Sequence, residues 1–215
     1  MKKITIILLA ACVVLIAACH LPGVRGNGDI KTEERQVAAF ANFDAGGAFE
    51  IQWQSGSPAL RITTDENLLA YIENNVSGDT LNLRTRDHVW PTRGIKVVIS
   101  SPTRTGARIR GAVKLTAKHL SGPSFALESK GASEVSLDGK IERLLVDMTG
   151  ASQLAADGLQ TNTAEISTTG AGDAEVAVKD TLKVVITGAG KVSYVGNPAT
   201  IDKRITGAGS IHRKD

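Results

Sequence analysis

Polar and apolar residues alternate along the second half of the chain, and the alternation restarts at each of six Gly-Ala pairs. The pairs begin at Gly111, Gly131, Gly150, Gly170, Gly188 and Gly207, which gives intervals of 20, 19, 20, 18 and 19 residues. A near-constant period of this length is typical of repeat proteins, in which each repeat is one structural unit. The period therefore has to be interpreted before any single motif.

Aligning the six copies on the glycine reveals a two-residue periodicity on both sides of it. The third position after the glycine is always polar, and the fourth is always apolar. The apolar column contains Leu115, Val135, Leu154, Ala174, Val192 and Ile211. Apolar residues also recur six and four positions before the glycine, where Lys203 breaks the second column. Each repeat therefore predicts two short strands that share one buried face.

Two strands cannot bury a face alone, but coils stacked on one another enclose a continuous apolar interior. We therefore predict an all-β fold in which residues 103–215 form a parallel β-solenoid, with two short strands per coil of about 19 residues. The six glycines form one corner, because glycine adopts φ > 0 without a Cβ clash. Turn dipeptides such as Asp138-Gly139 form the other corner. The residues before four of the glycines should stack as an exposed ladder: Thr149, Thr169, Thr187 and Thr206.

Residues 37–102 lack the repeat but keep the strand pattern. Phe49, Ile51 and Trp53 alternate with polar residues, and residues 58–63, 79–85 and 95–100 have the pattern of further strands. Residues 65–76, "DENLLAYIENNV", predict a short helix that begins after Thr64 or Asp65. We expect this β-rich cap to form one domain with the solenoid, over residues 37–215, and to cover the strand edges of its first coil.

Residues 1–18 have the pattern of an export signal peptide, because Lys2 and Lys3 precede an apolar run that ends in small residues. The sequence "LIAAC" at 15–19 resembles the lipobox of bacterial lipoproteins. This resemblance implies cleavage between Ala18 and Cys19 and acylation of Cys19, so that the membrane becomes a partner through the acylated cysteine. An ordinary secretory peptide cleaved nearby is the alternative.

The residues after Cys19 connect the proposed anchor to the domain. Residues 19–36 are mostly polar and include Pro22 and three glycines, which predicts a flexible tether. His20 rather than an aspartate follows the cysteine, and in the lipoprotein resemblance this implies the outer membrane. Because Cys12 lies in the signal peptide and Cys19 carries lipid, the folded part has no thiol for a disulfide, a metal or a nucleophile.

The Gly-Ala corners, the segments "FEIQWQSG" (49–56) and "LRITTDENLLAYI" (60–72) and the lipobox together resemble the head GIN domain family, which is described as autotransporter adhesin heads. The resemblance covers residues 40–212. It implies a right-handed β-helical fold with tight turns at Gly-Ser-Gly motifs, and this chain has Gly-Ala at those turns. The family has no established catalytic residues, so the resemblance implies none here.

Several kinds of chemistry are disfavoured by the residues themselves. The stretch "ITGAGKV" (186–192) is a corner and not a P-loop, because Val185 replaces the first glycine of that motif and Val192 follows the lysine. Removing Lys2 and Lys3 leaves 23 basic against 22 acidic residues, a side-chain charge of about +1, which does not favour nucleic acid binding. The four histidines are scattered without zinc-site spacing, so we predict no metal and no cofactor: His20, His88, His119 and His212.

Two groups of residues are candidates for binding or catalysis. Arg108, Glu128 and Asp147 fall in one outward column, where charges can either serve an enzyme acting on polysaccharide or form a solvated face. The stretch "RTRDHVWPTRG" (84–94) gathers cationic and aromatic side chains that suit an anionic polysaccharide or a lipid headgroup: Arg84, Arg86, His88, Trp90 and Arg93. In the alternative interpretation Trp90 packs under the loop and the arginines are solvated.

The sequence thus predicts a lipid-anchored cell-envelope protein that acts as a non-catalytic scaffold for binding or adhesion. Its expected partners are a glycan or a protein of the envelope or host, and not nucleic acid. One alternative is a periplasmic structural or stress-related accessory protein that binds another envelope protein. A polysaccharide-active enzyme is a further alternative.

Overall fold

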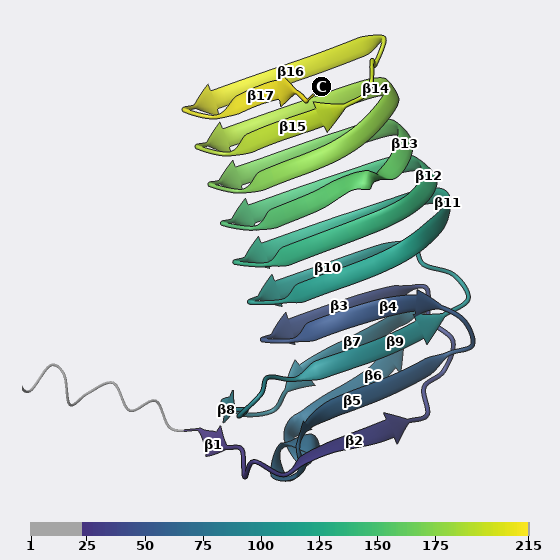
Figure 1. Cartoon of the computed structure of the whole chain (residues 1–215), viewed down its shortest axis with the longest axis vertical. Helices are drawn as coiled ribbons and strands as arrows, with labels where there is room; N and C mark the ends of the chain where they lie inside the picture. Colours follow the sequence, from purple (N-terminus) through teal and green to yellow (C-terminus); the bar gives the residue numbers. More distant parts are fainter. Residues whose placement is uncertain (1–22, 215) are drawn as a thin grey trace, which may run out of the picture.

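The computed structural model describes residues 23–214, and strands stacked into a parallel solenoid dominate it (Figure 1). The predicted signal peptide (1–18) and the predicted lipidation site at Cys19 lie outside the described residues. In the described part, the single helical segment is the 3-10 helix η1 (Glu66–Tyr71). The predicted all-β class is confirmed.

The regular coils follow the Gly-Ala period. Their strands are β10 (Gly106–Gly111), β11 (Lys114–Gly131), β12 (Glu134–Gly150), β13 (Gln153–Gly170), β14 (Asp173–Gly188), β15 (Lys191–Val195), β16 (Thr200–Gly207) and β17 (Ser210–Arg213). They pair in parallel, and all six corner glycines are in register with one another from coil to coil. The four threonines expected to form a ladder are also in register and exposed. The parallel β-solenoid is confirmed.

The corner demands glycine for two reasons. All six corner glycines have φ between +100° and +122°, a region that side chains with a Cβ rarely adopt. A Cβ on Gly131 would also lie 2.6 Å from the carbonyl oxygen of Gly111 in the coil below. That carbonyl accepts a hydrogen bond from the backbone N–H of Ala132 at 3.1 Å. The corners thus stack backbone on backbone, which leaves no room for a side chain.

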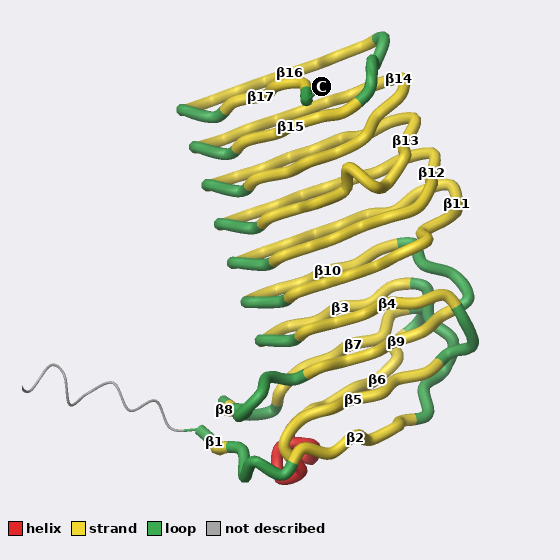
Figure 2. Tube along the Cα trace, viewed as in Figure 1, coloured by secondary structure: helices red, strands yellow, loops and turns green. Residues whose placement is uncertain are grey.

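The second edge differs from the sequence prediction of a tight turn between two short strands. Strands β11 to β14 run without a break for 16 to 18 residues and bend around this edge, as Figure 2 shows on its right side. The pairing register shifts at the bend, for example after Ala117 and after Ser136. Such bulges let a strand curve while its hydrogen bonds to the next coil continue. Each regular coil is therefore one bent strand.

The stack begins earlier in the chain than the predicted boundary at residue 103. Strands β3 (Asn42–Gly47) and β4 (Glu50–Ser55) pair in parallel with β10 and β11, and Gly47 is in register with Gly111. Below them β7 (Thr80–Thr85) pairs with β3, and β9 (Lys96–Ser101) pairs with β4. The alignment of Gly-Ala pairs did not find the corner at Gly46-Gly47, because Gly47 precedes Gly111 by 64 residues (111 − 47), well outside the repeat period.

Antiparallel strands cover the N-terminal end of the stack. Strand β5 (Ala59–Asp65) pairs with β9 and β2 (Ile30–Arg35), and β6 (Ile72–Ser77) pairs with β7. Strand β1 (Val24–Arg25) pairs in parallel with β8 (Val89–Trp90). The prediction of a flexible tether over residues 19–36 is therefore wrong for β1 and β2, whose backbone groups pair with the cap.

The predicted helix over residues 65–76 is shorter than expected. It ends at Tyr71, because residues 72–77 instead pair with β7 as strand β6. Asp65 makes no side-chain capping bond to the helix. Its buried carboxylate accepts hydrogen bonds from the backbone N–H of Gly28 at 2.8 Å and from the N–H and hydroxyl of Thr92 at 2.9 and 2.8 Å. Asp65 thereby ties the β1–β2 connection to the loop after β8.

The core runs through the interior of the stack and holds an aromatic cluster where the cap meets the coils. Trp53 is 1% exposed, as predicted for a core residue, and packs against Phe40, Phe43 and Phe125. Its indole N–H donates to Ser101 Oγ at 2.9 Å. Burial of each such large side chain stabilises the fold by roughly 2 to 3 kcal/mol. This cluster locks the irregular cap to the first regular coils.

Candidate functional site

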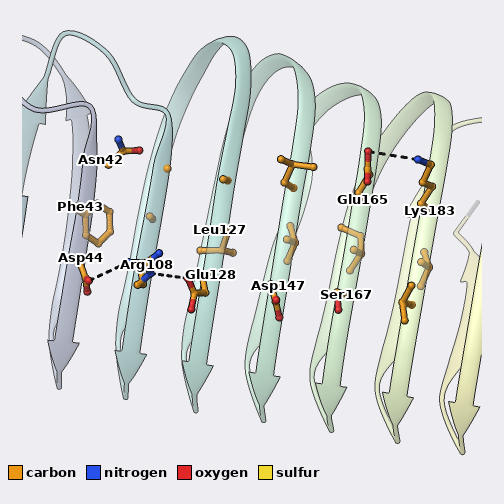
Figure 3. Close-up of a pocket in the computed structure, with 18 of the residues that line it drawn as sticks. Asn42, Phe43, Asp44, Arg108, Leu127, Glu128, Asp147, Glu165, Ser167 and Lys183 are labelled. Carbon is orange, nitrogen blue, oxygen red and sulfur yellow. Dashed lines mark hydrogen bonds and ion pairs between the residues drawn. The ribbon is translucent and has the colours of Figure 1, made fainter. Parts of the chain in front are cut away.

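A shallow groove of about 950 Å³ crosses the sheet that leads into the glycine corners (Figure 3). Two columns of outward side chains form its walls, at the fifth and the third position before each corner glycine. The first column contains Asn42, Gly106, Ala126, Leu145, Glu165, Lys183 and Asp202. The second column contains Asp44, Arg108, Glu128, Asp147, Ser167, Val185 and Arg204. The groove thus runs along the solenoid axis over β3, β10 to β14 and β16.

The groove is hollow where the first column has its smallest residues. Gly106 and Ala126 lie side by side in register on β10 and β11, so no long side chain projects from either strand there. Gly106 is buried, and a Cβ on it would lie 2.9 Å from Asn42 Oδ1, whereas Ala126 is exposed. Leu145 and Val185 are exposed farther along the groove. A ligand in the groove would therefore meet small residues first and then larger apolar side chains.

At the N-terminal end of the groove the carboxylates are all held in ion pairs. Asp44 is 7% exposed and accepts hydrogen bonds from Arg84 Nη2 at 2.7 Å and from Arg110 Nη2 at 2.8 Å. Arg84 also donates to the backbone oxygen of Asp44 at 2.7 Å, which fastens β7 to β3. Because this carboxylate is buried and held by two guanidinium groups, its first role is structural.

The next coils continue the charged column. Arg108 Nε donates to Glu128 Oε2 at 2.6 Å, and Lys130 Nζ lies 2.8 Å from Glu128 Oε1. Hydrogen bonds from Lys130 and Arg108 hold the pKa of Glu128 below its ordinary value. Hydrogen bonding to Glu128 raises the pKa of Arg108 in turn. Glu128 is thus ionised and occupied on both oxygens, which does not suit the protonated carboxylic acid that glycoside cleavage requires.

The C-terminal half of the groove is less constrained. Lys183 and Glu165 are 3.9 Å apart, a loose ion pair. Within residues 23–214, Asp147, Asp202 and Arg204 have no ion-pair partner within 4.0 Å. These side chains can reorient toward a ligand without breaking an internal ion pair. The groove thus has one end fixed by ion pairs and one adaptable end.

The residues of the predicted loop separate into two groups. Arg84 belongs to strand β7 and to the ion pair with Asp44. Arg86 lies 5.2 Å from the centre of the Tyr71 ring, His88 packs edge-on against Trp90 at 4.9 Å, and Arg93 is exposed. Trp90 is 46% exposed, so it does not pack beneath the loop. The structure therefore assigns Arg84 to an ion pair with Asp44 at the end of the groove and leaves the other four residues on the cap surface.

Sequence reasoning identified Arg108, Glu128 and Asp147 as one outward column, and the register confirms that they are neighbours. It missed Asp44 and Asn42, which extend the groove onto β3. The signal was present, since Asp44 stands three residues before Gly47, as Arg108 does before Gly111. In the described residues, no three His, Cys, Asp or Glu side chains lie close enough to hold a metal ion.

Stacked coils with glycine corners in register define this protein as a parallel β-solenoid, a repeat architecture in which each coil contacts only its neighbours. The chain belongs to the family described as "Putative auto-transporter adhesin, head GIN domain", whose model matches residues 39–198. The resemblance inferred from the sequence is therefore confirmed. None of the curated proteins matches the chain.

Similar solved structures include a "putative adhesin" from Bacteroides fragilis, with a TM-score of 0.75, 22% identity and coverage of 89% of this chain and 100% of the other. A "putative lipid binding protein" from Parabacteroides distasonis has a TM-score of 0.55 and 20% identity, covering 90% and 100%. A "putative adhesin" from Parabacteroides merdae has a TM-score of 0.55 and 19% identity, covering 91% and 100%. At these identities the likeness establishes the fold. Among the described residues there is no helix whose length and hydropathy would let it span a bilayer.

Proposed function

We propose that this protein is a lipid-anchored cell-envelope protein whose solenoid is a non-catalytic scaffold for binding and adhesion. The observation that carries the proposal is the groove, which extends over seven parallel strands of a rigid stack. At about 4.8 Å between strands, six intervals give the groove a length of roughly 29 Å. Such a length suits an extended polymer, a glycan strand or a peptide segment, more than a compact metabolite.

The chemistry of the groove supports binding rather than catalysis. Its best-placed acid, Glu128, is held ionised by Arg108 and Lys130, and Asp44 is enclosed by Arg84 and Arg110. Cleavage of a glycosidic bond generally uses one carboxyl group that stays protonated near neutral pH beside one that is ionised. Hydroxyl and amide groups of a polymer can instead bond to the unpaired Asp147 and Asp202 and pack on Leu145 and Val185.

The anchor in this proposal is Cys19, at the end of the lipobox-like sequence. Two or more acyl chains suffice for stable attachment to a membrane, whereas one chain gives only marginal binding. Family membership supports an envelope or extracellular location. In this proposal the anchor sits in the outer membrane, with the groove available to partners outside the bilayer.

Filling the groove tests the binding role. Ala126→Trp places an indole in the hollow of the first column, on an exposed position of β11 where the fold tolerates a larger side chain. Thr149→Trp is the matched control, since it adds the same indole to an exposed position of the same sheet outside the groove. The probes are purified peptidoglycan, lipopolysaccharide and mucin glycans, immobilised and incubated with wild-type and variant chains.

We expect the wild-type chain to retain at least one probe, with retention reduced at least tenfold by Ala126→Trp and little changed by Thr149→Trp. Equal effects of the two variants would mean that the groove is not the binding surface. Retention of none of these probes, combined with specific capture of one envelope protein, would favour the periplasmic accessory function. Cleavage of a probe would contradict the non-catalytic proposal.

A further inference from the structure

The β1–β8 ribbon has two chemically different faces. In a parallel pair, residues in register point to the same side of the sheet. Val24 pairs with Val89, both are half-buried, and Val89 packs against the core. Arg25 pairs with Trp90, and both are exposed. The ribbon therefore presents an arginine and a tryptophan side by side on its outer face.

Trp90 is exposed although its surroundings hold it in place. Gly26 N–H donates to the backbone oxygen of Trp90 at 3.0 Å, and Val24 N–H donates to that of His88 at 2.8 Å. Asp65 fixes the segments that follow both strands of the ribbon through Gly28 and Thr92. A tryptophan that is fastened at its backbone and 46% exposed at its ring presents apolar surface in a fixed direction. Tryptophan with that orientation is typical of the interface between lipid headgroups and acyl chains.

Three arginines lie near Trp90: Arg25 is in register with it, and Arg86 and Arg93 lie within four residues of it in the chain. All three are exposed, Asp87 lies 3.9 Å from Arg86, and the buried carboxylate of Asp65 accepts a hydrogen bond from the N–H of Thr92 at 2.9 Å. The exposed charges among these residues are three positive against one negative, because the second acid, Asp65, is buried. Arginine side chains hydrogen-bond to phosphate and extend their apolar stems along a bilayer surface. This combination of charge and indole matches an anionic leaflet.

The ribbon also lies close to the proposed lipid anchor. Gly23 contacts Trp90, since a Cβ on Gly23 would lie 2.6 Å from the indole nitrogen. Three residues lie between Cys19 and Gly23, and the four residue steps at ~3.5 Å each span at most about 14 Å. An acylated Cys19 at the membrane surface therefore keeps the ribbon within about two headgroup layers of the bilayer.

We infer that the outer face of the β1–β8 ribbon docks on the leaflet that holds Cys19, with Trp90 among the headgroups and Arg25 and Arg93 on lipid phosphates. This inference rests on the lipid anchor of the proposed function. Docking at the cap end fixes the orientation of the solenoid. The coils then extend away from the end of the stack that holds β1 and β8 (Figure 1), so the groove over β3, β10 to β14 and β16 is left free.

The chain contains a built-in reference for testing this contact. Its two tryptophans are Trp90, which is exposed, and Trp53, which is buried in the core. The acylated chain, purified from membranes, is reconstituted into phosphatidylcholine and phosphatidylglycerol vesicles whose acyl chains are brominated near the headgroup. We expect the bromine to quench the Trp90 emission and to leave the Trp53 emission intact. Trp90→Phe should remove the quenchable component.

Charge variants sharpen the test. Arg25→Gln with Arg93→Gln should lower the quenching and remove its dependence on phosphatidylglycerol. Arg143→Gln, an exposed arginine of β12 far from the ribbon, is the control and should change nothing. If the chain floats with vesicles while Trp90 remains unquenched and open to aqueous acrylamide, the docking inference is wrong and the anchor stands. A chain that fails to float with vesicles would overturn the anchor and the docking together.

Discussion

The two ends of the solenoid are finished in different ways. At the N-terminal end, antiparallel strands β2, β5 and β6 continue the sheet and cover it. At the C-terminal end, β16 pairs only with β14 and β17 only with β15 within the described residues. Ile201 and Ile205 of the last coil are 43% and 38% exposed. The N-terminal end is covered by cap strands, and the C-terminal end presents an unpaired strand edge.

The open end is protected by charge instead of by a cap. Lys203 occupies the inward column that holds Leu127, Val146, Ile166 and Val184 in the preceding coils. An inward-pointing lysine on an edge strand discourages pairing with another chain, because pairing would bury the ammonium group. The comparison indicates that the N-terminal end is built for one fixed contact and the C-terminal end for none.

The largest expected difference between the interior and the open end concerns the corner glycines. Gly131→Ala should lower the free energy of unfolding by about 2 to 5 kcal/mol, because it combines backbone strain with a clash against the Gly111 carbonyl. Gly207→Ala should cost less than about 1 kcal/mol, since the last coil can fray without disturbing the others. Urea denaturation measures both. Equal losses would mean that the last coil is as tightly coupled as the interior.

The closed end should depend on Asp65. Asp65→Asn removes the charge that receives the hydrogen bonds of Gly28 and Thr92, and should cost about 2 kcal/mol. Hydrogen exchange should accelerate at the amides of Gly28 and Thr92 while the corner amide of Ala151 stays protected. The control Asp87→Asn, at an exposed carboxylate, should cost less than about 0.5 kcal/mol. Uniform acceleration in all coils would contradict a local role for Asp65.

Acid should lower the stability of the N-terminal cap by protonating Asp65. Burial by itself raises the pKa of Asp65, but the hydrogen bonds from Thr92 and Gly28 outweigh it and hold the pKa below its ordinary value. A lowered pKa in the folded state stabilises the fold above the unfolded value of about 4, and this contribution disappears as the pH falls through the folded value. The stability difference between wild type and Asp65→Asn should therefore be constant above about pH 5 and shrink below about pH 4. A difference independent of pH would exclude this mechanism.

The smallest effect on stability, but a distinct effect on association, is expected from Lys203→Val. Valine restores the apolar column at the open edge, so the variant should self-associate more than the wild type at the same concentration. Analytical ultracentrifugation detects the change. Lys183→Val adds the same side chain on the outward face of β14 and should leave the chain at its original mass. If Lys203→Val sediments like the wild type, Lys203 does not prevent self-association through the open strand edge.

The regular coils could be predicted from the sequence because stacked positions are chemically alike. The glycine corner, the threonine ladder and the Arg108, Glu128 and Asp147 column all recur at one period, so a single alignment reveals them. The coil of β3 and β4 was not predictable in this way, since residues 56–105 separate it from its neighbour in the stack. Pattern reasoning gives the period of a repeat but not the spatial order of segments outside it.

The polar contacts of the cap could not be predicted from the sequence pattern either. Asp44 accepts hydrogen bonds from Arg84 and Arg110, which lie 40 and 66 residues away in the chain. Strands β1 and β8 have two residues each, too few to show any periodicity. Trp90 could be recognised as a candidate from its arginine-rich surroundings, but its neighbour Arg25 could not. Contacts between distant short segments depend on the folded topology, which no local pattern records.

The proposed adhesive function requires that the solenoid be exposed on the outside of the cell. The direct measurement is labelling of intact cells with a membrane-impermeant amine reagent, since Lys118, Lys140 and Lys179 are exposed on the coils. The same labelling after the outer membrane is permeabilised is the reference. We predict equal modification of the solenoid lysines before and after permeabilisation. Modification only after permeabilisation would contradict the adhesive function and place the protein in the periplasm as an accessory to another envelope protein.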